Sequence, residues 1–397
     1  MKAKTYCLII FFMLLSVSCS NNKNDEQNNT GKPGLQNPVI LPGTFYKRME
    51  GNIDNKYNVV MNLVRIDTVI KGFYYYQSSR EPIPFSMKSN MNNNGDILIE
   101  EGKGFDNNYN QVITGIFKGK FISDREFKGT WTKPASDKVL NFSLIEKYPE
   151  GSAQFDVTNY TSRKKQNDST HKGFAEIHIT FPSIKNFNNK SIQGKINAYL
   201  ESSLLEKIPG EGDIKKYESY DAMISDFFNR YNYEINESKK MDMPRDIYFQ
   251  DYFLIDILNN SGNIISFRQT TSIYEGGAHP NTLFAYKNYN LKTGKEIKLS
   301  DVFSGNYLPV LTKIAEKKFR KFYDVSQNES LENAGFWFDK GIFRLNDNYS
   351  FNTFAVTFQF NSYEVAAYAM GAPEIIIPYS EIKSIIRPDG LLGKFIK

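Results

Sequence analysis

The residue with the clearest potential for chemistry is His279, one of three histidines and the one that lies in a glycine-rich loop. It follows Gly276 and Gly277, whose backbone NH groups could be exposed, and lies four residues after Glu275. A general base also needs a nucleophile within hydrogen-bond reach, and the sequence names none. The other interpretation is structural, because glycines allow positive φ in a turn that an imidazole can fix by bonding to backbone. His279 is therefore the one catalytic candidate, and we predict a binding surface at Glu275, Gly276, Gly277, His279 and Asn281.

Other kinds of chemistry lack the residues they need. His171 and His178 are seven apart around a strand pattern, which puts them on opposite faces, so we predict no metal site. The oxygen-rich segments 90–96 and 106–110 match no calcium-binding loop and are explained by turns. No G-x-S-x-G motif is present, and the glycines of 102–104 lack the rest of a nucleotide fingerprint. We predict neither a cofactor nor a metal.

The first residues predict export. Lys2 and Lys4 form a basic start, 8–15 is an apolar run too short to span a bilayer, and small residues at 16–18 precede Cys19. This pattern resembles a bacterial lipoprotein signal, in which Cys19 would be acylated and become the first residue of the mature chain. Plain secretion is the other interpretation. We expect a signal peptide over 1–18 and a membrane-anchored lipoprotein facing the periplasm or the cell exterior.

The segment after Cys19 predicts a tether. Residues 19–42 are rich in asparagine and poor in apolar side chains, so they cannot offset the entropy cost of ordering. Cys19 would be the last cysteine left after cleavage, which excludes a disulfide within one chain. The formal net charge of +5 is mild, and the densest basic run, 163–165, lies in polar sequence. Nucleic acid is therefore not an expected partner, and the oligomeric state stays open.

Residues 43–148 predict an all-β domain, either a small barrel or a sandwich. Short strand patterns recur about every twelve residues between Gly, Asn and Asp clusters. The predicted strands are 44–50, 57–66, 69–76, 83–88, 96–100, 111–117, 126–131 and 139–146. Glycines precede aromatic residues by two positions, as in Gly129 and Trp131, which suits strands that bend around an aromatic interior. Small barrels are filled by side chains or hold a small ligand, and both alternatives stay open.

Beyond a predicted linker over 149–170, the pattern changes to an α+β module with an antiparallel sheet. We divide it into a first part, 171–262, and a second part, 263–397, which carries the Gly-Gly-Ala-His motif. Strands are predicted at 174–181, where Pro182 ends the run, and at 249–258, 263–274, 354–360 and 374–378. Helices are predicted at 190–207, 220–234, 306–323 and 380–386.

Two groups of motifs resemble a known family. The first is Tyr-Glu-Gly-Gly-Ala-His-Pro-Asn at 274–281 with the segment 289–303, and the second is 363–371 with 374–379. They resemble an exported α+β module of uncharacterised function that follows a partner segment. The pair occurs in the extracytoplasmic part of lysozyme-sensing anti-sigma factors and beside the catalytic domain of some peptidoglycan deacetylases. The resemblance covers 155–386, and Ala367 stands where the family commonly has proline.

The resemblance implies binding or sensing at the cell envelope. Because a cleaved signal is predicted at the start, we expect no cytoplasmic sigma-binding segment like that of the sensors. We also expect no separate metal-dependent domain like that of the deacetylases, because the sequence shows no histidine or aspartate cluster for one. We therefore predict a lipid-anchored envelope protein that binds a lysozyme-like protein or peptidoglycan. Two alternatives remain: a cell-wall hydrolase or deacetylase-like accessory enzyme that uses His279, and small-molecule binding in the N-terminal barrel.

Overall fold

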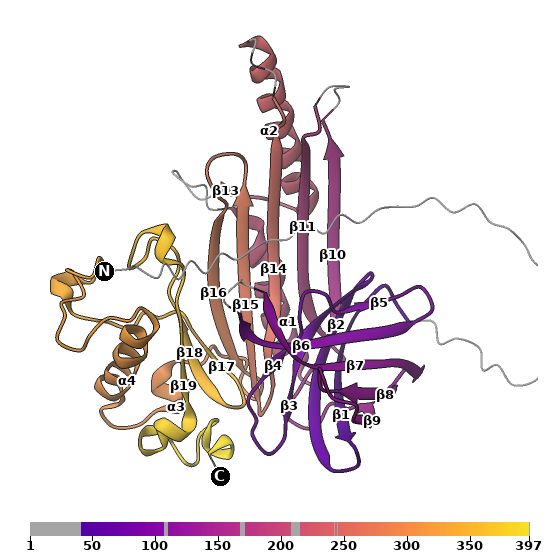
Figure 1. Cartoon of the computed structure of the whole chain (residues 1–397), viewed down its shortest axis with the longest axis vertical. Helices are drawn as coiled ribbons and strands as arrows, with labels where there is room; N and C mark the ends of the chain where they lie inside the picture. The colour runs from indigo at the N-terminus through magenta and orange to yellow at the C-terminus, as the bar shows by residue number, and fades with distance from the viewer. Residues whose placement is uncertain are drawn as a thin grey trace, which may run out of the picture.

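The computed structural model describes residues 41–106, 110–166, 171–207, 215–241, 243 and 245–396. The predicted signal peptide, Cys19 and nearly all of the predicted tether lie outside these residues. The described chain has three parts: a barrel, a five-stranded sheet with two helices, and a smaller C-terminal part (Figure 1).

The N-terminal part is a closed antiparallel barrel, which confirms the all-β prediction and decides between its two forms. Its strands are β1 (Thr44–Ile53), β2 (Tyr57–Ile66), β3 (Val69–Tyr76), β4 (Ile83–Pro84), β5 (Asn90–Met91), β6 (Asp96–Phe105), β7 (Gln111–Ser123), β8 (Glu126–Thr132) and β9 (Val139–Glu146). Neighbouring strands pair in chain order and β1 pairs with β9, so the ring closes, while β4 pairs beside β3. The predicted strand 83–88 is shortened to β4, and β5 takes its place in the ring.

Aromatic side chains fill the barrel interior. Phe117 packs edge-on against Tyr74 at 5.1 Å and against Phe142 at 5.3 Å between ring centroids. Glycines let the strands approach, because a Cβ added at Gly129 would lie 2.5 Å from the Cα of Gly119. The buried Glu101 carboxylate accepts hydrogen bonds from Tyr74, Thr114 and Trp131. These side chains build a packed core around one buried acid.

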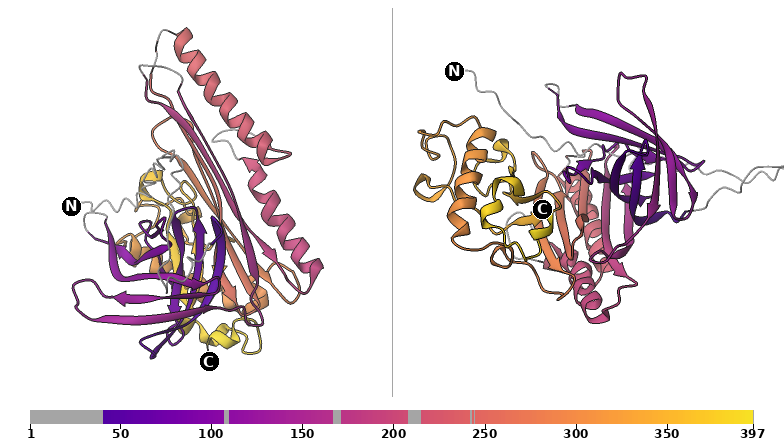
Figure 2. Two further views of the ribbon diagram at one scale, coloured as in Figure 1. Left: turned by 90° about the vertical axis from the view of Figure 1, so that its right-hand side faces the viewer. Right: turned by 90° about the horizontal axis from the view of Figure 1, so that it is seen from below.

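The middle part is a five-stranded sheet covered on one face by helices (Figure 2). Its strands, in spatial order, are β10 (Gln154–Lys165), β11 (Phe174–Lys185), β14 (Tyr248–Ser261), β15 (Ile264–Tyr274) and β16 (Asn281–Asn290). All neighbours are antiparallel except β11 and β14. A parallel pair needs a long crossover. The chain supplies it with α1 (Lys190–Ser202), the short strands β12 (Glu206–Lys207) and β13 (Lys215–Lys216), and α2 (Tyr220–Lys240).

Each helix follows the apolar spacing that predicts it. On α1 the buried residues Ile192, Ile196 and Leu200 recur every four positions, and Asn189 caps the start of the helix. Ser219 caps α2 in the same way. The helix pair packs on alternate residues of β11 and β14, such as Ile177 and Phe253, which are fully buried. The predicted α+β class is therefore confirmed.

The structure differs from the sequence predictions at three places: the linker, the end of the strand at Pro182 and the division of the module. Residues 154–165 form the edge strand β10, which is polar because much of it is exposed. Pro182 does not end β11. The pairing of β11 with β14 stops at Thr180, so the NH that proline lacks is not needed for a hydrogen bond to β14. The predicted division between 262 and 263 falls in the hairpin that joins β14 to β15, inside one sheet.

The C-terminal part has its own core. It contains α3 (Leu299–Val302), α4 (Tyr307–Phe322), β17 (Tyr349–Phe351), β18 (Ala355–Gln359) and β19 (Glu374–Pro378). The last predicted helix, 380–386, is two 3₁₀ turns, Tyr379–Glu381 and Lys383–Ile385. Tyr379, Ile382 and Ile385 are buried and three residues apart, which matches the three-residue turn of a 3₁₀ helix better than the 3.6 of an α-helix.

The barrel and the C-terminal part lie side by side on the sheet face opposite the helices (Figures 1 and 2). Tyr46 of the barrel packs edge-on against Phe155 of β10, with ring centroids 5.2 Å apart. Thr353 of the C-terminal part donates a hydrogen bond of 2.6 Å to the carbonyl of Arg80 in the barrel. The three parts are therefore joined by direct contacts.

Candidate functional site

The glycine-rich loop connects β15 to β16 at one end of the sheet. Gly276 has φ 100° and Gly277 has φ 95°, the left-handed region that favours glycine. Both are exposed, and the Tyr274 hydroxyl donates a 3.3 Å hydrogen bond to the carbonyl of Gly277. Asn281 begins β16 opposite Ile273. The glycines thus form the turn that the structural interpretation predicts.

His279 is held on three sides. Its ring stacks on Tyr368, with centroids 3.5 Å apart and planes 8° from parallel. Nδ1 lies 3.0 Å from the Pro280 carbonyl and Nε2 lies 3.3 Å from the Tyr363 hydroxyl. A carbonyl only accepts, so Nδ1 is the donor to Pro280. Both ring nitrogens therefore have partners within the protein.

Tyr363 projects from a strained position. Its φ is 64°, in the left-handed region that bulky residues rarely adopt, and it is 52% exposed. The turn is fixed because Glu364 accepts a 2.8 Å hydrogen bond from the backbone NH of Asn361 and another of 2.8 Å from Asn346. Strain that the surroundings maintain is typical of functional sites. The segments 274–281 and 363–371 thus meet around His279.

Glu275 does not join this group. Its carboxylate receives two hydrogen bonds from the Arg230 guanidinium on α2, at 3.2 and 2.7 Å. Arg230 also contacts Asp226 on the same helix. Burial works to lower the pKa of Arg230, but Glu275, together with Tyr217 and Asp251, outweighs it and the pKa is raised. Of the predicted site residues, Glu275 therefore ties α2 to the loop, while His279 contacts Tyr363 and Tyr368.

A second polar cluster, not predicted from the sequence, lies on the sheet face opposite the helices. His178 contacts the buried Glu176 carboxylate through Nε2, and its Nδ1 lies 3.2 Å from the Thr161 hydroxyl. Its ring stacks on Tyr252, with centroids 4.9 Å apart. Burial, and then the charge of Glu176, raise the pKa of Tyr252 to about 12. The alternation of Glu176 and His178 with Ala175 and Ile177 is the sequence signal for this polar face.

The cluster resembles the acid, imidazole and hydroxyl chain of hydrolases, but its surroundings differ. A hydrolase also needs backbone NH groups aimed at a developing oxyanion. Thr161, His178 and Tyr252 lie opposite one another in paired strands. The backbone NH groups there belong to the hydrogen bonds between strands and are not directed at a substrate. We interpret the cluster as a satisfied polar network.

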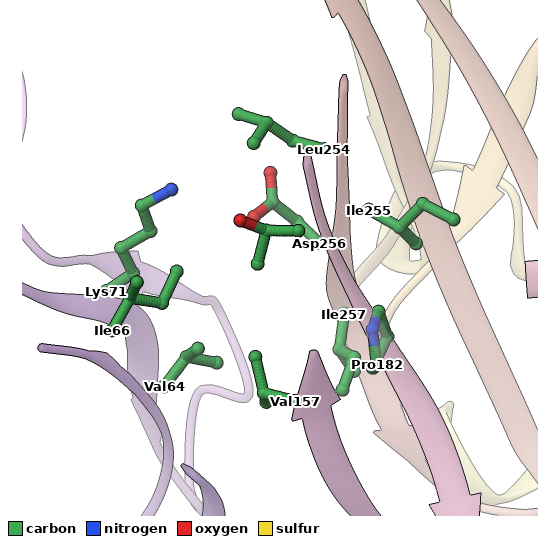
Figure 3. Close-up of a pocket in the computed structure, with 10 residues that line it drawn as sticks. Val64, Ile66, Lys71, Val157, Pro182, Leu254, Ile255, Asp256 and Ile257 are labelled. Atoms are coloured by element: carbon green, nitrogen blue, oxygen red, sulfur yellow. The ribbon is translucent and has the colours of Figure 1, made fainter. Parts of the chain in front are cut away.

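The cavity between the barrel and the sheet is too small to bind a ligand. Lys71 and Asp256 lie on its two sides among aliphatic side chains (Figure 3). Its volume is about 20 Å³, which holds one water molecule and no larger ligand. Asp256 forms a 2.9 Å ion pair with Arg268. Burial acts to raise the pKa of Asp256, but Arg268 and Lys71 outweigh it and lower the pKa.

An Asp256→Asn variant is expected to lose the stability that this ion pair contributes. Because the folded pKa of Asp256 lies below the ordinary value of 3.8, the contribution is present above that pH and disappears as the pH falls through the folded pKa. Urea unfolding between about pH 2 and 6 measures this. The difference in unfolding free energy between wild type and variant should shrink at the acid end of this range. A constant difference over the range would contradict the assignment.

Two further features bear on the predicted partners. Within the described ranges, no group of three or more His, Cys, Asp or Glu side chains could hold a metal ion. Among the helices of the same residues, none has the length and apolarity to cross a membrane.

Comparison with known proteins identifies two domains. Residues 168–282 match the family described as "Deacetylase PdaC", and residues 300–380 match the family described as "Protein of unknown function (DUF3298)". No curated protein matches the chain. One similar solved structure is a DUF3298 family member from Bacteroides fragilis, 22% identical, covering 61% of this chain and 97% of its own, with a TM-score of 0.47.

Another is a DUF3298 family protein from Pseudomonas aeruginosa, 15% identical, covering 60% of this chain and 97% of its own, with a TM-score of 0.42. The predicted linker contains β10, which precedes the region matched by the PdaC family. β10 pairs with β11, the first strand inside that region. In the order that the motifs predict, one region of the chain thus matches the PdaC family and a later region matches the DUF3298 family.

Proposed function

We propose that the chain binds a ligand at the bacterial cell envelope through the surface around His279 and Tyr363. This surface, the aromatic surface below, consists of Tyr274, Gly276, Gly277, His279, Tyr363 and Tyr368. The observation that supports it is the contact of His279 with Tyr363 and Tyr368, 84 residues or more away, which leaves Tyr363 half-exposed in strained backbone.

The chemistry of the aromatic surface suits recognition. Tyrosine offers a large rigid contact area at low entropy cost, with a hydroxyl that can donate or accept. The exposed glycines bring backbone close to any bound molecule. The resemblance of the motifs indicates a lysozyme-like protein or peptidoglycan as the ligand. Acylation at Cys19 would hold the chain at the membrane where such ligands occur.

Binding accounts for the geometry of His279 better than catalysis does. A general base must present a free lone pair to a substrate. Here Nε2 lies 3.3 Å from the Tyr363 hydroxyl and Nδ1 donates to the Pro280 carbonyl, so both ring nitrogens have partners and the imidazole orients the two tyrosines that flank it. This arrangement supports a role in positioning the exposed Tyr363 ring.

A Tyr363→Asn variant is expected to weaken binding by roughly thirtyfold, the effect of removing an aromatic hot spot worth about 2 kcal/mol. Asparagine tolerates the left-handed backbone, so the turn should persist. The control is Tyr233→Asn, which removes a tyrosine that is 65% exposed on α2. The measurement is retention of purified protein on immobilised lysozyme and, separately, on insoluble peptidoglycan.

The two supports distinguish the two ligands. Retention on lysozyme alone identifies a protein ligand, and retention on peptidoglycan alone identifies a glycan. If the wild-type protein is retained on neither, or if Tyr363→Asn behaves like Tyr233→Asn, the proposal is wrong.

A further inference from the structure

We infer that a second site, at the other end of the sheet, binds a neutral saccharide. The site, called the basal pocket here, lies where the β14–β15 hairpin turns at Asn263 and where β16 ends. The segments 148–154 and 186–189 and residues 291–292 complete its wall. The glycine-rich loop follows the opposite end of β15, so the basal pocket is separate from the aromatic surface and does not rest on the proposed function.

The pocket is large enough for a ligand and is formed by fixed backbone. Its volume is about 350 Å³, within the range of roughly 300–1,000 Å³ for small-molecule sites. The backbone NH of Asn263 donates to the Gly151 carbonyl at 2.8 Å, and that of Leu291 donates to the Asn263 carbonyl at 2.9 Å. Gly151 is in the left-handed region, φ 82°, and a Cβ there would lie 2.7 Å from the Asn263 nitrogen. The loops are thus bonded to one another before any ligand arrives.

Several side-chain amides line the wall. Gln154, Asn186, Asn188 and Asn263 each carry an acceptor oxygen and a donor NH₂ group. A sugar hydroxyl likewise donates and accepts, so amides can match it without a fixed charge. Asn186 donates a 3.3 Å hydrogen bond to Gln154, which places their polar ends together. The wall therefore suits a ligand with many neutral hydroxyl or amide groups.

Two aromatic rings supply the apolar contact. Tyr148 and Phe187 are half-buried, and both pack against the core of the sheet. The Tyr148 hydroxyl donates to Glu146 at 2.8 Å, which fixes the ring. A sugar ring has one face rich in C–H groups, and aromatic side chains provide the matching apolar surface. Amides and two rings in one pocket favour a saccharide over a purely polar ion.

The charges at the pocket argue against an anion. One acid, Glu150, and one base, Lys292, line it, so they leave no excess of positive charge. The adjacent start of α1 is already capped, because Asn189 accepts from the backbone NH of Ile192 at 3.1 Å. A neutral ligand is therefore the better fit.

Titration calorimetry of the purified protein with N-acetylglucosamine, its β-1,4-linked disaccharide and cellobiose tests the inference. We expect saturable binding of at least one sugar, and little change in affinity between about 50 and 500 mM salt because the ligand is neutral. Asn186→Gly removes an amide while keeping the left-handed backbone, φ 50°, and should weaken binding roughly fivefold. The matched control is Asn55→Gly, at an exposed turn of the barrel with the same φ of 50°.

A second variant tests the aromatic contact independently of the amide at Asn186. Phe187→Leu keeps an apolar side chain on the core and removes the ring face, so it should also weaken binding. The inference is overturned if no sugar gives saturable heat up to about 10 mM, or if Asn186→Gly and Asn55→Gly bind alike. Equal binding by Phe187→Leu and wild type would also overturn it, as would a tenfold loss of affinity at high salt.

Discussion

An Asn260→Ala variant is expected to lose about 3–4 kcal/mol of unfolding free energy. The Asn260 side chain is 2% exposed and lies between the barrel and the sheet. Its Nδ2 donates to the Tyr46 hydroxyl at 2.9 Å and to the Ala153 carbonyl at 2.7 Å, and its Oδ1 accepts from the Ala153 NH at 2.8 Å. Alanine leaves both backbone groups of the buried Ala153 without these partners, at about 1–3 kcal/mol each.

The loss should also change how the parts unfold. Tyr46 belongs to a barrel strand, yet it is buried among the residues of the sheet core. With Asn260 in place we expect one cooperative transition for barrel and sheet, because they share this buried contact. In Asn260→Ala carrying Trp337→Phe, so that Trp131 of the barrel is the remaining tryptophan, the fluorescence should change at lower urea than far-ultraviolet circular dichroism, which follows the whole chain.

Two further variants isolate the effect. Tyr46→Phe removes only the hydroxyl and should cost about 1–2 kcal/mol, and the double variant should show coupling with Asn260→Ala. Asn141→Ala, an exposed position on β9, should change stability by less than about 0.5 kcal/mol. An Asn260→Ala protein as stable as the Asn141→Ala control would contradict the proposed interface.

A Phe319→Ala variant is expected to lose about 3–5 kcal/mol, because it opens a cavity at the centre of the C-terminal core. Phe319 is fully buried on α4. Its ring contacts those of Phe336 and Phe338, at 4.8 and 5.4 Å between centroids, and that of Phe343 at 5.3 Å. The cavity would be bounded by other rings, which relax poorly, so the cost should lie near the upper end of the range.

The matched control is Phe322→Ala on the same helix, because Phe322 is 38% exposed. It should cost about 1 kcal/mol or less. Thermal unfolding by differential scanning calorimetry compares the two variants. Similar melting temperatures for Phe319→Ala and Phe322→Ala would show that α4 does not pack as described.

The strand and helix patterns predicted much of the local structure because they depend on local periodicity. Predicted strands 57–66 and 69–76 coincide with β2 and β3, and the spacing of Ile192, Ile196 and Leu200 predicted the buried face of α1. The pattern could not distinguish a barrel from a sandwich. That choice depends on β1 pairing with β9, as in Met49 with Glu146, across nearly the whole domain.

Two predictions were wrong where the neighbours of a strand, rather than its own sequence, decide its structure. The edge strand β10 is polar along much of its length, so it resembles a linker in the sequence, and only pairing with β11 makes it a strand. Pro182 lies within β11 because β14 no longer pairs there. Both depend on what lies beside the strand, which the sequence of the strand does not contain.

By itself, the sequence determined the classes of the parts, the turn at Gly276 and Gly277, and the motifs of the PdaC and DUF3298 domains. These depend on composition, alternation and backbone freedom over a few residues. Only the tertiary structure decided that His279 meets Tyr363 and Tyr368 while Glu275 turns away to Arg230. The physical reason is that side-chain partners far apart in the chain are chosen by how sheets and loops pack, and local periodicity carries no information about that choice.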